Sequence, residues 1–224
     1  MTDVEPAQSA RFLAVDTTSE SGSLALASAV CVIEEVALDG AGGFAHIIFD
    51  EIVRLLARHG LSLRDIDCFA SAAGPGSFTG VRVGLTAVKG LAEANQRKAV
   101  AVSNLEALAF FGSRPLRAPI LDARRGEIYG AVYDAELHIV QEETVMPVER
   151  WMTGLPVADI QLVTNGFEPP TNPYPIVHAP RALAGAIAQI AARRFSNGLA
   201  LDPAQIDANY VRRSDAELFW RDPH

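Results

Sequence analysis

Short apolar runs separated by turn-forming residues occupy the first forty positions of the chain. They predict three strands, near Arg11 to Asp16, Ser23 to Ser28 and Val30 to Leu38. No helical period lies between these runs, so the strands should follow one another directly. The expected order at the start of the chain is therefore β-β-β.

Helical periods and further strands alternate after the turn at Gly40 to Gly43. Ser103 and Glu106 have the spacing of a capping box, in which both side chains satisfy free amides at a helix start. The elements expected here are a helix over Phe44 to His59, a buried strand over Asp67 to Ala72, a helix over Ser77 to Asn95, a strand over Lys98 to Val102 and a short helix ending near Gly112.

A second series of elements follows the proline-containing stretch Arg114 to Pro119. Its members are strands at Ile120 to Asp122, Glu127 to Tyr133 and His138 to Thr144, a short helix at Val148 to Met152, a strand at Ile160 to Thr164, a proline-broken loop at Gly166 to Pro175 and a helix at Arg181 to Phe195. The similar order of the two halves predicts a duplicated α/β fold divided near Gly112 to Ala118. We therefore expect an N-terminal lobe over residues 1–112 and a C-terminal lobe over residues 113–224.

Two helices of the first half are unusually apolar. Apolar residues cover an arc of roughly 180° on the helix that begins at Phe44, and polar residues occupy a strip of only about 80° on the helix that begins at Ser77. Both helices could be buried within one compact subunit, or each could present one apolar flank to a protein partner. The residues assigned to such a partner interface are Phe44, Ile48, Phe49, Ile52, Leu56, Gly80, Val83, Gly84, Leu85, Ala87, Val88 and Leu91.

Charge and cysteine content limit the classes of function. The 224 residues carry 27 acidic and 19 basic side chains, a formal net charge of −8, which argues against binding nucleic acid without a partner. Cys31 and Cys68 lack the spacing of a disulfide framework or a cysteine zinc site, as expected for a protein of the reducing cytoplasm. No apolar run approaches the roughly 20 residues that span a bilayer, so no membrane partner is expected.

Three loops carry candidate chemistry. Ala72 to Gly80 leads from a strand into a helix, Asp16 to Ser23 is rich in hydroxyls, and Asp122 to Glu127 offers a carboxylate and two guanidiniums. Each could hold an anion or a phosphate group. A tight or hydrogen-bonded turn is the favoured interpretation of the first two loops, and the third could equally be a salt-bridged turn. The candidate vestigial nucleotide or anion loop comprises Asp16, Thr17, Thr18, Gly76, Ser77, Asp122 and Arg124. The histidines lack metal-ligand spacing, so neither a metal nor a cofactor is expected.

Four motifs, distributed over nearly the whole chain, resemble the TsaB (YeaZ-like) family. They are Leu13 to Thr18, Gly74 to Gly84, Leu121 to Tyr129, and the tail Tyr210-Val211-Arg212. The resemblance implies a duplicated actin-like (ribonuclease-H-like, ASKHA) fold with two lobes, in which helices of the first lobe pair with the TsaD subunit or with a second copy. The sequence departs from the family pattern at two places, since Ile47 follows His46 where a serine is common and Ala208 replaces a proline.

The resemblance also implies a function. The chain would be a non-catalytic subunit required for threonylcarbamoyladenosine modification of tRNA, binding and activating a TsaD-like threonylcarbamoyltransferase. A TsaE-like ATPase and tRNA would join through the assembly, and the isolated chain would form a homodimer in the cytoplasm. The alternative is an actin-like nucleotide-dependent enzyme or a metallopeptidase-like protein that acts alone.

Overall fold

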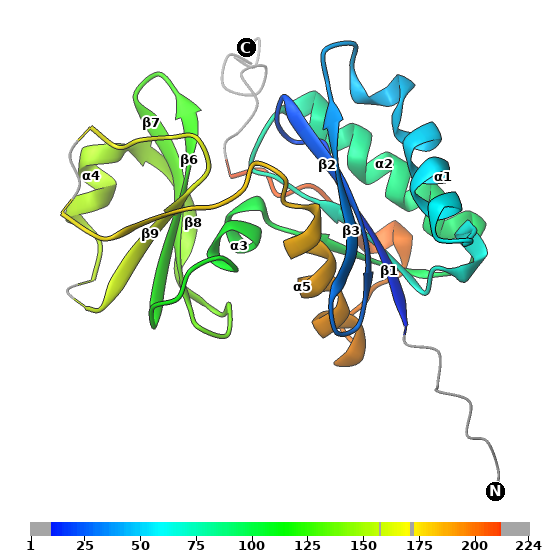
Figure 1. Ribbon diagram of the computed structural model, residues 1–224. Helices are drawn as coiled ribbons and strands as arrows, with labels where there is room; N and C mark the ends of the chain where they lie inside the picture. The colour runs from blue at the N-terminus through cyan, green and yellow to red at the C-terminus, as the bar shows by residue number, and fades with distance from the viewer. Residues whose placement is uncertain (1–9, 157, 171–172, 212–224) are drawn as a thin grey trace, which may run out of the picture. The chain divides into compact units, whose positions relative to one another are not determined.

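The computed structural model describes residues 10–156, 158–170 and 173–211, and its chain divides into two compact units. Unit 1 comprises the described residues of Met1–Ala107 and Pro180–Ala208, and unit 2 comprises those of Leu108–Ala179 and Asn209–His224. Each unit contains a five-stranded sheet (Figure 1). Arg212, the last residue of the tail motif, lies outside the described residues.

The sheet of unit 1 combines an antiparallel meander with two parallel strands. β1 pairs with β2 antiparallel on one side and with β4 parallel on the other, and the strand order is β3-β2-β1-β4-β5. The strands are β1 (Arg11–Asp16), β2 (Ser21–Ser28), β3 (Val32–Asp39), β4 (Cys68–Ala72) and β5 (Lys98–Val102). The β-β-β start that the apolar runs predicted is therefore confirmed.

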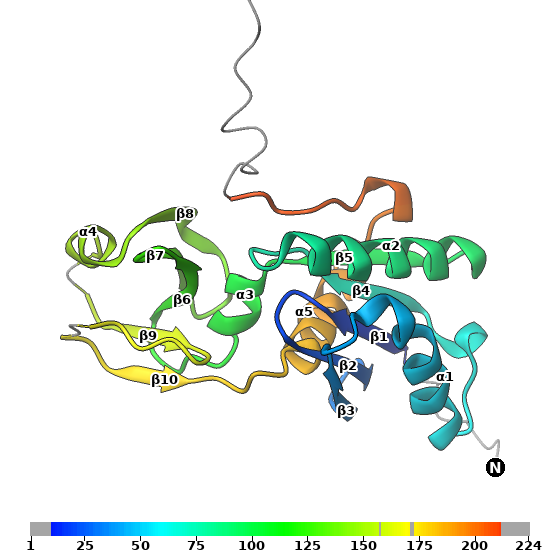
Figure 2. The same ribbon diagram turned by 90° about the horizontal axis from the view of Figure 1, so that it is seen from above.

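Helices cover both faces of this sheet. Because successive side chains of a strand point to opposite faces, β1 contributes residues to both of the resulting cores. Leu13 and Val15 of β1 share a core with residues of two helices, α1 (Ile48–Arg58) and α2 (Phe78–Ala94). Phe12 points to the other face, where its ring meets that of Phe195 edge-on at 5.5 Å. Phe195 belongs to α5 (Ala184–Ser196), so α5 lies on the opposite side of the sheet from α1 and α2 (Figure 2).

The position of α5 differs from the expected division of the chain. The boundary at residue 112 assigned this helix to the second lobe, whereas its contacts place it in unit 1. Ser23 Oγ accepts hydrogen bonds from the N–H groups of Leu183 (3.2 Å) and Ala184 (3.0 Å), and Glu35 accepts one from Gly185 (2.7 Å). Side chains of β2 and β3 thus satisfy amides at the start of α5.

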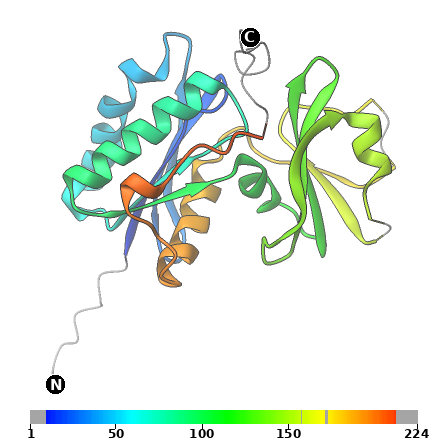
Figure 3. The same cartoon turned by 180° about the vertical axis from the view of Figure 1, so that it is seen from behind.

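Short helical segments complete unit 1. The helix expected over Phe44 to His59 is divided at Ile47 into a 3₁₀ turn, η1 (Phe44–His46), and α1. The remaining segments are η2 (Leu63–Asp65), α3 (Asn104–Ala109), which begins in unit 1, and η3 (Pro203–Gln205). η3 packs against α2, and Ile206 beyond it is buried in the same core (Figure 3).

The sheet of unit 2 repeats the strand arrangement of unit 1. Its order is β10-β9-β6-β7-β8, with β7 antiparallel and β9 parallel to β6, and the short helix α4 (Val148–Thr153) supplies Trp151 to its core. The strands are β6 (Leu116–Arg124), β7 (Glu127–Asp134), β8 (Ile139–Pro147), β9 (Ile160–Thr164) and β10 (Ile176–His178). β10 was not expected, but the duplicated α/β fold is confirmed.

Candidate functional site

The wide apolar arc of α1 is divided between the core and the surface. Ile48, Ile52 and Leu56 are at most 2% exposed and pack in the core of unit 1. Phe49 and Val53, one turn apart, are 52% and 58% exposed. One flank of α1 therefore holds the helix against the unit, and the adjoining flank presents a large aromatic and a branched aliphatic side chain outward.

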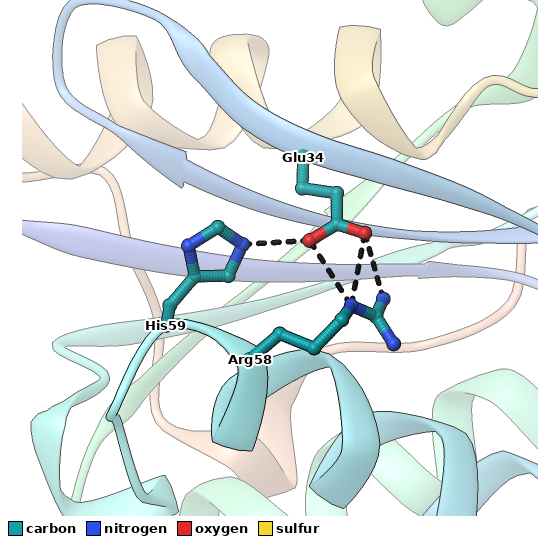
Figure 4. A network of polar contacts seen from close by, with 3 residues as sticks. All are labelled: Glu34, Arg58 and His59. Atoms are coloured by element: carbon teal, nitrogen blue, oxygen red, sulfur yellow. Dashed lines mark hydrogen bonds and ion pairs between the residues drawn. The ribbon is translucent and has the colours of Figure 1, made fainter.

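The carboxyl end of α1 is linked to the edge strand β3 by hydrogen bonds and ion pairs. Glu34 of β3 accepts hydrogen bonds from Arg58 Nη2 (2.7 Å) and Nε (3.1 Å to the same oxygen), and its other oxygen lies 2.6 Å from His59 Nε2 (Figure 4). The hydrogen bonds from Arg58, and then that from His59, lower the pKa of the Glu34 carboxyl. These contacts connect the last turn of α1 to the edge of the sheet.

α2 exposes less apolar surface than α1. Val83 is half-buried, and Phe78 in the first turn is 45% exposed, with the Arg82 guanidinium carbon 3.8 Å from the centre of its ring. The polar strip expected from the sequence is present, since Thr79 and Thr86 are exposed. The second apolar side of α2 is covered by η3 and Ile206, segments of the same chain.

Most of the residues assigned to the partner interface lie inside unit 1. Ten of the twelve assigned residues are buried within this chain, so only Phe49 and Val83 of the set reach its surface: the buried ones are Phe44, Ile48, Ile52, Leu56, Gly80, Gly84, Leu85, Ala87, Val88 and Leu91. The physical reason is that the core of unit 1 and its own tail occupy the wide arcs, as the single-subunit reading allowed. Phe49 is exposed and Val83 is half-buried. The role of these two residues as partner contacts stays a prediction.

The second candidate site is a cluster of buried polar groups at the carboxyl ends of β1 and β4. Asp16 is 2% exposed, and its Oδ1 accepts hydrogen bonds from the N–H (2.9 Å) and hydroxyl (2.6 Å) of Thr18. Asn104 Nδ2 donates to Thr18 Oγ1 (2.7 Å), and Asn104 Oδ1 accepts from the Gly74 N–H (3.0 Å). Desolvation raises the pKa of the Asp16 carboxyl, although these hydrogen bonds act in the opposite direction.

The glycine-rich segment that follows β4 uses its amides within the chain. The Ser77 N–H donates to Thr18 O (2.7 Å), and Ser77 Oγ accepts from the Gly80 N–H (3.3 Å) as the N-cap of α2. A Cβ at Gly76 would lie 2.6 Å from Thr18 O, so the glycine permits close packing of two loops. These contacts favour the interpretation of the segment as a tight strand-to-helix turn.

Asp122 and Arg124 belong to unit 2, in the hairpin between β6 and β7. Asp122 accepts a hydrogen bond from the Arg124 N–H (2.7 Å), and its carboxylate lies 3.3 Å from the Arg124 guanidinium. Arg124, Arg125 and Gly126 all have positive φ angles, as in a tight hairpin turn. The structure thus describes this pair as a salt-bridged turn of unit 2, whereas the other five candidate loop residues belong to unit 1.

Within the described part of the chain, His, Cys, Asp and Glu nowhere gather in threes as metal ligands would. Among the described residues, no helix combines the length and apolar character that crossing a membrane requires. The member of the buried polar cluster that the sequence did not reveal is Asn104, because its partner Thr18 lies 86 positions away.

Two sheets of matching strand order, with helices on both faces of the first, define a duplicated α/β protein of the actin-like (ribonuclease-H-like, ASKHA) class. Residues 41–209 match the family model "TsaD: tRNA N6-adenosine threonylcarbamoyltransferase". The chain is 29% identical to "tRNA threonylcarbamoyladenosine biosynthesis protein TsaB" of Bacillus subtilis (strain 168), covering 93% of this chain and 97% of the relative. The chain belongs to this family, in its TsaB (YeaZ-like) branch.

Two further comparisons agree with this membership. The TsaB protein of Escherichia coli (strain K12) is 35% identical over 130 residues, which cover 56% of each chain. The solved structure "YeaZ from Pseudomonas aeruginosa" has a TM-score of 0.77 and 27% sequence identity, covering 90% of this chain and 99% of that one. The resemblance carried by the four sequence motifs is thereby confirmed.

Proposed function

We propose that this chain is a non-catalytic subunit of tRNA threonylcarbamoyladenosine biosynthesis that binds and activates a TsaD-like threonylcarbamoyltransferase. The family model and the names of the curated relatives support the pathway. The observation that carries the partner role is the outward flank of α1, where Phe49 and Val53 are more than half exposed on a helix that is fixed by its other flank. Aromatic side chains on a rigid element are typical anchors of protein interfaces.

The remaining parts of the proposal follow from the assisting role. A TsaE-like ATPase and tRNA would join the assembly, with tRNA bound only through the complex because the chain carries a net charge of −8. The same flank of α1 would pair two copies of the isolated chain, since a second copy could cover this exposed apolar surface in the absence of the TsaD-like partner. A cytoplasmic location belongs to this proposal as well.

Partner binding tests the proposal with matched variants. Phe49→Asp and Val53→Asp place a carboxylate on the exposed flank, and Val140→Asp is the control because Val140, on β8 of unit 2, is 53% exposed. Phe49 is the second residue of α1, where an aspartate suits the helix dipole, so the variant should fold. We expect the two α1 variants to bind a purified TsaD-like subunit at least about 30-fold more weakly, and the control to change by less than about twofold.

Reconstituted tRNA modification provides the second readout. Omitting the chain should abolish modification and restoring it should recover the activity, while the chain alone should show none. Equal binding by Phe49→Asp, Val53→Asp and the control would refute the α1 surface. Full modification without the chain would refute the proposed function, and ATP or peptide hydrolysis by the isolated chain, lost in Asp16→Ala, would favour the enzyme alternative.

A further inference from the structure

The segment that follows α5 contacts three other elements in succession. Leu201 and Ala99, a residue of the edge strand β5, exchange two backbone hydrogen bonds of 2.9 Å. η3 then packs against α2 (Figure 3), and Ile206 enters the core of unit 1. Asn209, the first residue of this segment in unit 2, donates from Nδ2 to Glu143 Oε2 of β8 (2.5 Å). The chain therefore reaches β8 with a polar contact shortly before the described residues end at position 211.

β8 is an edge strand of the unit 2 sheet, and its first residue is exposed. Among the described residues, no strand pairs with the outer edge of β8, and Ile139 is 51% exposed. Ile139 is paired with Tyr133 of β7, and the Tyr133 hydroxyl donates to Glu143 (2.7 Å). Because paired residues of neighbouring strands point to the same face, Ile139 and Glu143 share one face of the sheet. The chain that follows Asn209 thus begins beside the face on which Ile139 is exposed.

The charges around β8 are of one sign. The stretch from residue 134 to residue 149 has no Lys or Arg, and its acidic residues are Asp134, Glu136, Glu142, Glu143 and Glu149. Residues 212–224, which lie outside the described residues, begin with Arg212 and Arg213. Opposite charges attract the two stretches to each other.

An apolar run follows the two arginines at a suitable distance. Leu218, Phe219 and Trp220 come 9 to 11 positions after Asn209. Ile139 is four residues along β8 from Glu143, which corresponds to about 13 Å, whereas nine residues of extended chain span about 30 Å. The apolar run can therefore reach Ile139 from the point at which the chain contacts β8.

We propose that residues 212–224 bind to the sheet of unit 2 in the same chain, with the two arginines beside the glutamates of β8 and the apolar run 218–220 over Ile139. The bound segment covers an open edge strand, which otherwise offers unpaired backbone groups to other chains. The contact at Asn209 keeps the segment close to β8, at an effective concentration in the millimolar range, so a weak contact suffices. No TsaD-like partner takes part, so this proposal is independent of the proposed function.

The fluorescence of Trp220 tests this binding in the full chain. The chain has two tryptophans, Trp151 and Trp220, and the variant Trp220→Phe gives the signal of Trp151, which is subtracted. A peptide of residues 212–224 is the unshielded reference. We expect the acrylamide quenching constant of Trp220 to be at least about threefold lower in the wild-type chain than in the peptide, because the sheet shields a bound indole from the quencher.

Matched variants locate the contact. Ile139→Asp places a carboxylate under the apolar run, and Val30→Asp is the control because Val30, between β2 and β3 of unit 1, is 83% exposed. We expect the quenching of Trp220 to approach that of the peptide in Ile139→Asp and to stay unchanged in the control, because a carboxylate is costly to bury. If Ile139→Asp does not fold, Phe219→Asp makes the same change on the segment and should give the same increase.

Three outcomes would overturn the proposal. The first is equal quenching of Trp220 in the wild-type chain and in the peptide. The second is shielding that persists in Ile139→Asp or, where that variant does not fold, in Phe219→Asp. The third is shielding that is lost on about 100-fold dilution, because the segment would then bind a second copy of the chain. Shielding that is independent of concentration and lost in Ile139→Asp alone of the two sheet variants would support it.

Discussion

Two glycines of α2 should respond in opposite directions to the same substitution. Gly80 faces the loop after β1, where an added Cβ would lie 1.9 Å from Thr17 O, whereas a Cβ at Gly90 would have no atom within 4 Å. Alanine lowers the entropy of the unfolded chain and favours helix at both positions. Gly80→Ala and Gly90→Ala therefore isolate the effect of the close contact.

The expected magnitudes follow from these distances. Gly90→Ala should stabilise the protein by about 0.5–1 kcal/mol. Gly80→Ala requires loop and helix to separate by roughly 1.5 Å to reach van der Waals contact, which costs about 1–3 kcal/mol as overpacking. The separation also weakens the hydrogen bonds of Thr17 to Gly80 and of Ser77 to Thr18, each contributing about 1 kcal/mol. The net effect should be a loss of about 2–4 kcal/mol.

Thermal unfolding monitored by far-ultraviolet circular dichroism measures both variants against the wild type. At about 2–4 °C per kcal/mol for a chain of this size, Gly90→Ala should raise Tm by about 1–4 °C and Gly80→Ala should lower it by about 4–16 °C. An unchanged or higher Tm for Gly80→Ala would show that the loop after β1 and α2 are not in tight contact, which would refute this reasoning.

Three further predictions concern titratable groups. Because burial raises the pKa of Asp16, the folded state loses stability as the pH rises above the ordinary pKa of 3.8. In urea unfolding, Asp16→Asn should therefore be more stable than the wild type above that pH and nearly equal to it below that pH. The lowered pKa of Glu34 has the opposite sign, and the deficit of Glu34→Gln at neutral pH should shrink below pH 4.5. Burial raises the pKa of Cys68 to about 12, whereas Cys31 is exposed. A thiol reagent at pH 8 should therefore modify only Cys31 until the protein unfolds, and prompt reaction of both thiols would contradict this.

Some features of the candidate site depend on residues close together in the sequence, and others depend on residues far apart. Ser77 as N-cap and the burial of one flank of α1 could be predicted, because each depends on residues within a few turns of one helix. Ten residues of the predicted interface are buried because four of them, in η1 and α1, face the core of unit 1, and six of them, in α2, lie under the sheet and a distant segment of the same chain. Ile206, which belongs to that covering segment, lies more than one hundred residues from the helix in sequence.

By itself, the sequence determined the elements and their repeated order. Strands β5 and β9 have the predicted bounds because alternation and breakers are local properties of the chain. The tertiary structure alone decided that α5 belongs to unit 1, where Ser23 receives hydrogen bonds from amides about 160 positions away, and that Asn104 completes the cluster around Thr18. Such contacts depend on the path of the whole chain, which a local pattern of apolar and polar residues does not specify.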